Sequence, residues 1–351
     1  MSKAHDGGAP AMSNADDGEA PATSKRKPGE VPVAPPISDA AARDAETLSP
    51  RTIWAMWVAL WDRRESVNAV ALARILVGLV LVIDIASTYQ HDLVTHVYGN
   101  QHGYGSAVDA WPRALFGTDP GPALVDLSFV LAICILFGIA TPVALVGYAL
   151  VGAQLGNIAA ATDQGVYPLL RICVVLLALG RCHARWSVDA FVLAKLGRPP
   201  SRVVPAWPRY LLMTQLVWMY CSGGMNKSGA AWGPFGGFTA IENIVADPNV
   251  ARFAPGWITP YVVLARLATA ATIVFELCAP IYLLAYYFAE TPGRGGRMRE
   301  VFRKLRIRWV WIALGLSFHL GIAITLHLGA FPWGMLALYP VLLRPSELQG
   351  G

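Results

Sequence analysis

The sequence predicts an all-α, polytopic integral membrane protein with about eight transmembrane helices and both termini in the cytoplasm. Hydrophobic residues make up 55% of the 351 residues and charged residues only 15%, against roughly 25% charged residues in an ordinary globular protein. Apolar segments of about 20 residues, the length needed to cross a bilayer, recur from residue 69 onward. These observations exclude a soluble two-domain protein.

The N-terminal region differs from the rest of the chain. Residues 1–48 show no apolar periodicity and include five prolines between positions 21 and 36. We therefore expect a disordered cytoplasmic tail rather than a signal peptide. In residues 49–66 the side chains of Trp54, Trp57 and Trp61 recur at helical spacing, which predicts an interfacial amphipathic helix. A cytoplasmic extension of the first span is the alternative.

Residues 67–345 form the predicted transmembrane domain, followed by a short C-terminal tail at 346–351. The fourth and eighth candidate spans are short and the sixth is long, so we expect tilt, kinks at Pro260 and Pro280, or local thinning of the bilayer. The eight candidate spans lie at about 69–88, 122–139, 142–160, 165–181, 207–224, 259–288, 308–328 and 330–344.

Positive charges test this topology, because Lys and Arg collect in cytoplasmic loops. The predicted outer loops contain few such residues, chiefly Arg113, Lys227 and Arg252. The net charge of +5 therefore follows from topology, and we expect no nucleic acid partner. The five scattered cysteines are interpreted as small apolar side chains, and we expect no metal site. The predicted cytoplasmic positions are Arg63, Arg64, Arg181, Arg185, Lys195, Arg198, Arg202, Arg294, Arg297, Arg299, Arg303, Lys304, Arg306, Arg308 and Arg344.

Ionisable residues inside spans are costly, so each is a functional candidate. Depth along the spans predicts an outer contact of Asp84 with Arg171 or Arg266, and an inner contact between Arg74 and Glu276. The alternative is that such pairs only fix the register of the helices. His319 lies in the middle of the seventh span. We expect either a hydrogen-bonded histidine of the core or a side chain that contacts a quinone or a proton.

The segment 220–237 is unusual because a predicted helix ends there in a glycine-rich loop with one lysine, Lys227. Low-dielectric surroundings disfavour the ammonium form of a lysine, so its amine can act as a base. The alternative is a lysine that extends toward the outer headgroups.

Several segments together resemble one family, the vitamin K-dependent gamma-glutamyl carboxylases and their bacterial relatives with a horizontally transferred transmembrane (HTTM) domain. The most specific elements are Trp-Ser-Val-Asp at 186–189 and Gly-Gly-x-x-Lys-x-x-x-x-Trp at 223–232. The similar segments lie at 71–85, 137–146, 183–192, 207–232, 275–284 and 318–338.

The resemblance implies that Lys227 is the base that deprotonates a reduced quinone of the vitamin K hydroquinone or menaquinol type. In the carboxylases, oxygen then converts the quinol into a stronger base that takes a proton from a glutamyl acceptor, and the resulting carbanion captures CO2. It also implies a quinone pocket lined by Trp232, His319, Tyr220, Gln215 and Asn226. Further family-like positions are Arg74, Asp84, Trp186, Ser187 and Asp189.

Two departures from the family pattern weaken the case for carboxylation by this protein. A histidine that the carboxylases carry between their third and fourth spans has no counterpart at 157–168, where Asp163 or Tyr167 could substitute. No counterpart of their large lumenal region follows the last span. Quinol chemistry is therefore better supported than glutamate carboxylation.

Three functions remain open. The first is a multi-pass enzyme of the cell (inner) membrane that oxygenates a quinol at the outer face with Lys227 as base. The second is a maturation factor for a secreted peptide that acts with soluble partner proteins. The third is a non-enzymatic lipid-binding membrane protein or transporter.

Overall fold

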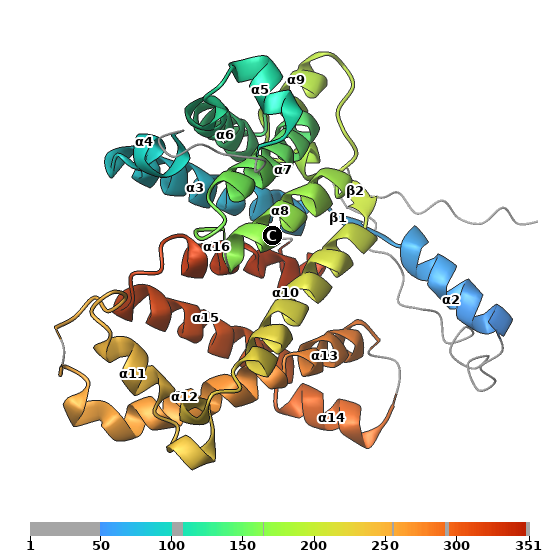
Figure 1. Ribbon diagram of the computed structural model, residues 1–351. Helices are drawn as coiled ribbons and strands as arrows, with labels where there is room; N and C mark the ends of the chain where they lie inside the picture. Colours follow the sequence, from blue (N-terminus) through green and yellow to red (C-terminus); the bar gives the residue numbers. More distant parts are fainter. Residues whose placement is uncertain (1–49, 100–107, 164, 255, 292–294, 349–351) are drawn as a thin grey trace, which may run out of the picture. The chain divides into compact units, whose positions relative to one another are not determined.

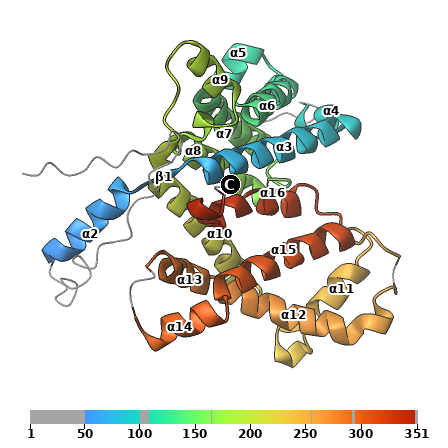
Figure 2. The ribbon, with the colours of Figure 1, turned by 180° about the vertical axis from the view of Figure 1, so that it is seen from behind.

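The computed structural model describes residues 50–99, 108–163, 165–254, 256–291 and 295–348. The predicted tail at 1–48 and residues 349–351 lie outside these ranges. Within them the chain is helical apart from one pair of short strands (Figures 1 and 2), which confirms the predicted helical class.

The α-helices and strands of the described residues follow in chain order. They are α2 (Pro50–Asp62), β1 (Arg64–Ser66), α3 (Asn68–Gln90), α4 (Leu93–Tyr98), α5 (Ala110–Phe116), α6 (Pro120–Phe137), α7 (Thr141–Ile158), α8 (Val166–Leu179), α9 (Val188–Lys195), β2 (Val203–Pro205), α10 (Trp207–Asn226), α11 (Ala240–Ala246), α12 (Val262–Leu277), α13 (Pro280–Glu290), α14 (Arg297–Lys304), α15 (Ile307–Thr325) and α16 (Phe331–Ala337).

Within the described ranges, five helical segments are long and apolar enough to cross a membrane. They correspond to the first, second, third, sixth and seventh predicted spans, so the chain is a multi-pass membrane protein. The fourth and eighth predicted spans coincide with shorter apolar helices, and the fifth with α10, which is long but less apolar. The count of eight and the cytoplasmic termini stay predictions. The five segments are Asn68–Gln90, Pro120–Phe137, Thr141–Ile158, Thr259–Leu277 and Ile307–Thr325.

The sixth predicted span is not one straight helix. It begins with a 3-10 turn at Thr259–Tyr261, continues as α12 and stops at Leu277, after which Pro280 starts α13. Proline has no N–H to donate and fits the first turn of a helix, so it favours a new start at this point. The kink expected at Pro280 takes the form of a break between α12 and α13.

The strand pair was not predicted. The helix expected at 49–66 ends at Asp62, and β1 pairs antiparallel with β2, with Glu65 opposite Val204. The location of α2 at a membrane interface stays a prediction. The pairing brings the start of α3 beside the start of α10 (Figure 1).

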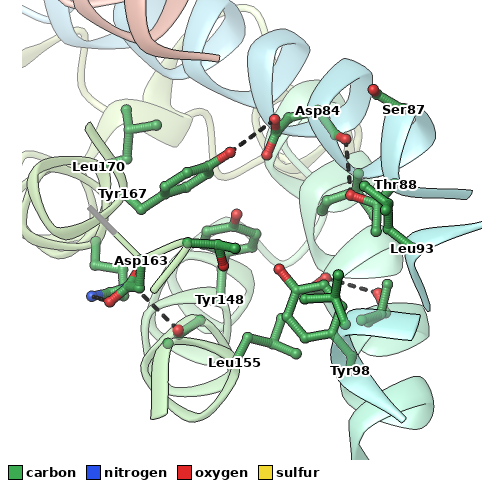
Figure 3. A pocket seen from close by; sticks show the side chains of 18 residues that line it. Asp84, Ser87, Thr88, Leu93, Tyr98, Tyr148, Leu155, Asp163, Tyr167 and Leu170 are labelled. Atoms are coloured by element: carbon green, nitrogen blue, oxygen red, sulfur yellow. Dashed lines mark hydrogen bonds and ion pairs between the residues drawn. The ribbon is translucent and has the colours of Figure 1, made fainter. Parts of the chain in front are cut away.

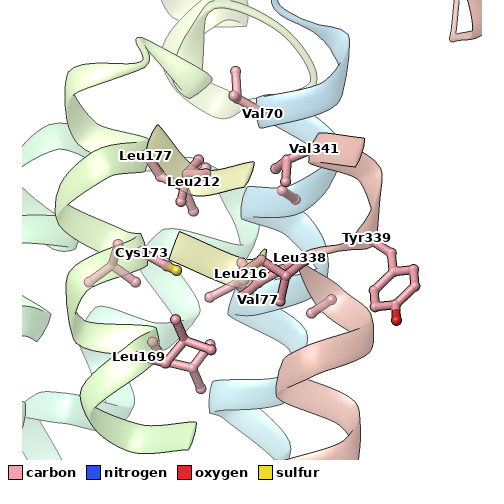
Figure 4. Close-up of a cluster of buried hydrophobic side chains, with 14 of the residues drawn as sticks. Val70, Val77, Leu169, Cys173, Leu177, Leu212, Leu216, Leu338, Tyr339 and Val341 are labelled. Carbon is pink, nitrogen blue, oxygen red and sulfur yellow. The ribbon is translucent and has the colours of Figure 1, made fainter. Parts of the chain in front are cut away.

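Buried hydrophobic side chains join α3, α8, α10 and the C-terminal segment (Figure 4). Val77, Leu169, Leu216 and Leu338 come from these four regions and are almost fully buried. Cys173 is a free thiol within the same cluster. The helix α10 therefore rests on the same core as α3, α8 and the C-terminal segment.

Several segments that the charge distribution assigns to the cytoplasm lie together. Glu290 at the end of α13 pairs with both Arg63 and Arg344, and Arg308 at the start of α15 pairs with Glu347. The predicted topology requires such grouping, because these residues flank different spans. Which side of the membrane they face stays a prediction.

Candidate functional site

Lys227 directly follows α10, at a point where a second helix comes very close. A β-carbon added at Gly224 would lie 3.0 Å from Cβ of Glu276 and 3.1 Å from the backbone nitrogen of Leu277. A side chain there would push the helices apart. The Gly-Gly element therefore allows the end of α10 to pack against the end of α12.

An ion pair joins these two helix ends. Lys227 Nζ lies 2.9 Å from Oε1 and 2.7 Å from Oε2 of Glu276, and it donates to the carbonyl oxygen of Gly223 at 3.3 Å. The side chain of Glu276 is 6% exposed and that of Lys227 is 22% exposed. The carboxylate is therefore nearly dry, whereas a polar group can still reach the amine.

Trp232 completes the arrangement, which we call the Lys227 cluster (Lys227, Glu276 and Trp232). A 3-10 turn at Ala230–Trp232 brings the indole back to the amine, and Nζ lies 5.1 Å from the ring centroid. This distance is within the range of cation–π attraction. Two other predicted pocket residues do not join: Asn226 is exposed and donates to Ser222, and Gln215 lies about three turns earlier in α10.

The predicted contact between Arg74 and Glu276 is wrong. Counting depth along one straight span from 259 to 288 put Glu276 toward the inner side. Because α12 ends at Leu277, Glu276 instead meets the end of α10 and pairs with Lys227. An acidic partner of the lysine is thus the main feature that sequence reasoning missed.

Arg74 instead stabilises backbone carbonyl groups. Its fully buried guanidinium donates to the carbonyl oxygens of Ile135 at 2.5 Å, Leu136 at 2.9 Å and Trp186 at 2.5 Å. Two of these carbonyl groups belong to the last turn of α6, where the backbone carbonyls have no N–H partner within the helix. Arg74 therefore caps α6 and ties it to the Trp-Ser-Val-Asp element.

The Trp-Ser-Val-Asp element is also structural. The side-chain oxygen of Ser187 caps the start of α9, and the carboxylate of Asp189 accepts from the backbone nitrogens of Ala140 and Thr141, both at 2.8 Å. A carboxylate is favoured at the N-terminus of a helix, here α7, because it meets unpaired N–H groups. Trp186, the first residue of the element, adopts a left-handed backbone conformation with a φ of +51°. This element thus shapes the turn between α6 and α7.

A second buried polar cluster lies two turns before Lys227 on α10. The hydroxyl of Tyr220 is 2.7 Å from Nε2 of His319 and 2.8 Å from the hydroxyl of Tyr339. Phe275 of α12 packs edge-on against Tyr220, with ring centroids 5.1 Å apart. Because seven residues are about two turns, Tyr220 precedes Lys227, which directly follows α10, by roughly 10 Å along the helix axis.

This second cluster contains two predicted pocket residues, Tyr220 and His319, and one that was missed, Tyr339. His319 is fully buried, and its Nδ1 has no hydrogen-bond partner in the part of the chain that the structure describes. Gly315 makes room for the cluster, because a β-carbon there would lie 1.9 Å from the Tyr339 hydroxyl oxygen. Nothing in the sequence distinguishes Tyr339 from other aromatic residues near span ends.

Asp84 lines a separate cavity of about 210 Å³ between α3, α4, α6, α7 and α8 (Figure 3). Its carboxylate accepts a hydrogen bond from the Tyr167 hydroxyl at 3.2 Å. Tyr98 and Tyr148 also line the cavity, and burial raises the pKa of Tyr98, which keeps its hydroxyl neutral. Tyr167, a possible substitute for the missing histidine, therefore belongs to this cavity and not to the Lys227 cluster.

Neither predicted partner of Asp84 pairs with it. Arg171 lines the same cavity, but its guanidinium binds both carboxylate oxygens of Asp163 at 2.5 and 2.6 Å. Arg266 lies 3.3 Å from Glu242 of α11. In each case a carboxylate from a nearer loop or helix takes the arginine, so the predicted Asp84 contacts are wrong.

A buried ion pair at the start of α10 was not predicted from the sequence. Arg209 binds both oxygens of Glu65, at 2.5 and 2.7 Å, and also meets the hydroxyl of Tyr286 at 2.7 Å and the carbonyl oxygen of Val341 at 2.9 Å. Arg209 and Glu65 lie at or just before the start of predicted spans. Charges at such positions are expected at the membrane surface, so neither residue stood out.

The family model of the HTTM domain matches residues 63–291, more than half of the chain. The matched range includes Arg74, the Trp-Ser-Val-Asp element and the whole Lys227 cluster, whereas His319 and Tyr339 follow it. Comparison with curated proteins and with solved structures gives no match.

Proposed function

This chain belongs to the HTTM domain family, and on that premise we propose that it is an integral membrane enzyme that removes a proton from a hydroxyl group of a lipid-soluble quinol. Family membership indicates a carboxylase-like membrane protein. The observation that carries the proposal is the Lys227 cluster, where an amine, a buried carboxylate and an indole ring meet. Such a set combines a proton acceptor with a flat aromatic contact.

The pair of Lys227 and Glu276 can accept one proton without separating. In the ion pair, Lys227 carries three protons on its amine and Glu276 is ionised. Lys227 passes one proton to Glu276 and takes one from the substrate hydroxyl. Glu276 ends neutral, and the ammonium group of Lys227 stays beside the deprotonated oxygen, where its charge stabilises the product.

The surroundings of the amine fit an aromatic compound with a weakly acidic hydroxyl. Trp232 offers its ring face next to Nζ, and the partial exposure of Lys227 gives access. A bound quinol would supply the redox chemistry with O2. We extend the proposal to oxygenation, and with CO2 to carboxylation of a glutamyl acceptor on a secreted peptide or partner protein, because the family resemblance implies these steps.

Consumption of quinol and O2 by the purified full-length protein tests the proposal, with reduced menaquinone as the probe. Lys227→Met removes the amine but keeps an unbranched side chain, and we expect the rate to fall at least roughly 100-fold. Arg266→Gln is the matched control, because it breaks a more exposed ion pair of the same helix, α12. Equal rates for wild type and Lys227→Met would remove Lys227 from the reaction.

A second candidate is a membrane protein that binds a small polar ligand without transforming it. The cavity at Asp84 favours it, because its lining includes neither Lys227 nor Glu276. Absence of quinol turnover in the wild type, together with a ligand-induced rise in the unfolding temperature that Asp84→Asn abolishes, would favour this candidate over the first.

A further inference from the structure

A basic cavity lies between α13, α14 and the start of α15. Its volume is about 600 Å³, and Phe288 and Phe302 form part of its wall. Five arginines and two glutamates line it, so positive groups exceed negative ones by three and the cavity attracts anions. These residues are Arg299, Arg303, Arg306, Arg308, Arg344, Glu300 and Glu347.

Three of the arginines are already engaged by the protein. Arg308 pairs with Glu347, and Arg344 pairs with Glu290, with an Nε to Oε1 distance of 2.8 Å. Arg299 donates to the side chain and to the carbonyl oxygen of Thr291 and stacks over a phenyl ring. These contacts shape the wall of the cavity and leave those arginines little capacity for a ligand.

Arg303 and Arg306 are the cations that remain available. Both are exposed, and neither forms an ion pair or a side-chain hydrogen bond with any residue in the described ranges. Arg303 lies in the last turn of α14, and Arg306 has a φ of +49° in the bend before α15. Two guanidinium groups at one cavity are suited to a phosphate group, which accepts paired N–H donors.

The position of the cavity along the fold matches the surface of a membrane. α15 is long and apolar enough to cross a bilayer, and Trp309 in its first turn lines the cavity. Met298 and Val301 of α14 and Leu305, which directly follows it, lie on one face at helical spacing and are 58%, 50% and 56% exposed. An exposed apolar face on a short basic helix is typical of a helix that lies in the interface of a membrane.

We propose that this cavity binds the headgroup of an anionic phospholipid. Arg303 and Arg306 hold the phosphate, and Phe302 and Trp309 of the same lining meet the acyl chains. The apolar face of α14, formed by residues that do not line the cavity, rests on the surrounding bilayer. An anionic lipid uses both features, whereas free phosphate uses only the charge. The charge distribution predicts that this end of the fold is cytoplasmic, where anionic lipids attract basic segments.

Native mass spectrometry of the full-length protein, titrated with equal amounts of phosphatidylglycerol and phosphatidylcholine, tests the proposal. We expect the wild type to retain phosphatidylglycerol preferentially and Arg303→Gln/Arg306→Gln to bind it roughly 30-fold more weakly. The matched control is Arg297→Gln/Lys304→Gln, which removes the same number of charges, from residues of α14 that do not line the cavity. The control should bind phosphatidylglycerol like the wild type.

Three outcomes would overturn the proposal. An equal loss in both double variants would show general attraction to basic charge rather than a site. Equal retention of both lipids by the wild type would show that the headgroup charge is not recognised. Displacement of phosphatidylglycerol by millimolar inorganic phosphate would assign the cavity to a soluble anion.

Discussion

Two ion pairs on α10 show how differently the same kind of contact can be built. At the start of the helix, Arg209 uses its donors on Glu65, Tyr286 and two backbone carbonyls, and its side chain is 1% exposed. At the other end, Lys227 meets one carboxylate, one carbonyl oxygen and one ring, and it is partly exposed.

The difference separates a structural pair from a reactive one. A guanidinium keeps its proton in proteins, whereas an amine can lose one. The Arg209–Glu65 pair, fully buried and fully bonded, can neither exchange a proton nor receive a ligand. The Lys227–Glu276 pair can do both, because its amine is reachable and its carboxylate is dry. Experiments at both ends of the helix test this difference.

The largest expected effect is at the structural pair. Arg209→Ala leaves the carboxylate of Glu65 buried without its cation, and such changes cost about 3–5 kcal/mol of stability. Thermal unfolding in detergent, followed by tryptophan fluorescence, measures the loss. Arg297→Ala, an exposed change on α14, serves as the control and should leave the midpoint unchanged. A loss at Arg209 no larger than at Arg297 would contradict its structural role.

At the reactive pair the effect should appear in activity rather than in stability. Glu276→Gln keeps the shape of the side chain but removes the final proton acceptor, so we expect quinol turnover to fall roughly 100-fold. Stability should change by only about 1–2 kcal/mol, since Lys227 is partly solvated. Turnover and thermal unfolding on the same preparation give both values. Full turnover would mean that Lys227 acts without Glu276.

A substitution beside the cluster around His319 should have a smaller effect on stability, and it tests how tightly this cluster is packed. In Gly315→Ala the new β-carbon would overlap the Tyr339 hydroxyl, and overpacking of this kind costs about 1–3 kcal/mol. Gly321→Ala is the matched control in the same helix, because its β-carbon would meet nothing within 4 Å. Unfolding midpoints should fall for the first variant and stay level or rise for the second. Equal midpoints would show that the Tyr339 hydroxyl moves freely.

The smallest effect concerns pH. Burial lowers the pKa of His183, in the turn before the Trp-Ser-Val-Asp element, although Asp189 acts in the opposite direction. The unfolded chain then binds this proton more readily than the folded one. The stability contributed by neutral His183 is therefore complete above a pH of about 6.5 and is lost as the pH falls. His183→Gln should flatten the decline of the unfolding midpoint between neutral and mildly acidic pH; an unchanged decline would assign it to other groups.

The sequence could predict the helical class, many of the helices and the local part of the site. Lys227 and Trp232 are five residues apart in a glycine-rich segment, so a single tight turn can bring them together. The long helices follow from apolar composition, and the break before Pro280 follows from the missing N–H of proline. Each of these features depends on residues close together in the chain.

The partners of the charged residues could not be predicted in the same way. Counting along a span gives a depth, but it gives neither the direction in which a side chain points nor the helix that lies opposite. Glu276 was assigned to Arg74 because a straight span was assumed. Asp84 was assigned to Arg171 because Asp163, which lies nearer to Arg171, was not considered as the partner of that arginine. Tyr339 and Glu65 were missed for the same reason, since their partners are far away in the sequence.

Arg74 also sets an order for the biogenesis of the protein. An arginine inside an apolar helix costs about 2.5–3.5 kcal/mol until acceptors reach it. Its acceptors at Ile135 and Trp186 are synthesised 61 and 112 residues later. During translation, α3 is therefore made before the chain that supplies these acceptors. The helix α6 supplies the carbonyl groups of Ile135 and Leu136, and the last acceptor is in place only after residue 186 has been synthesised.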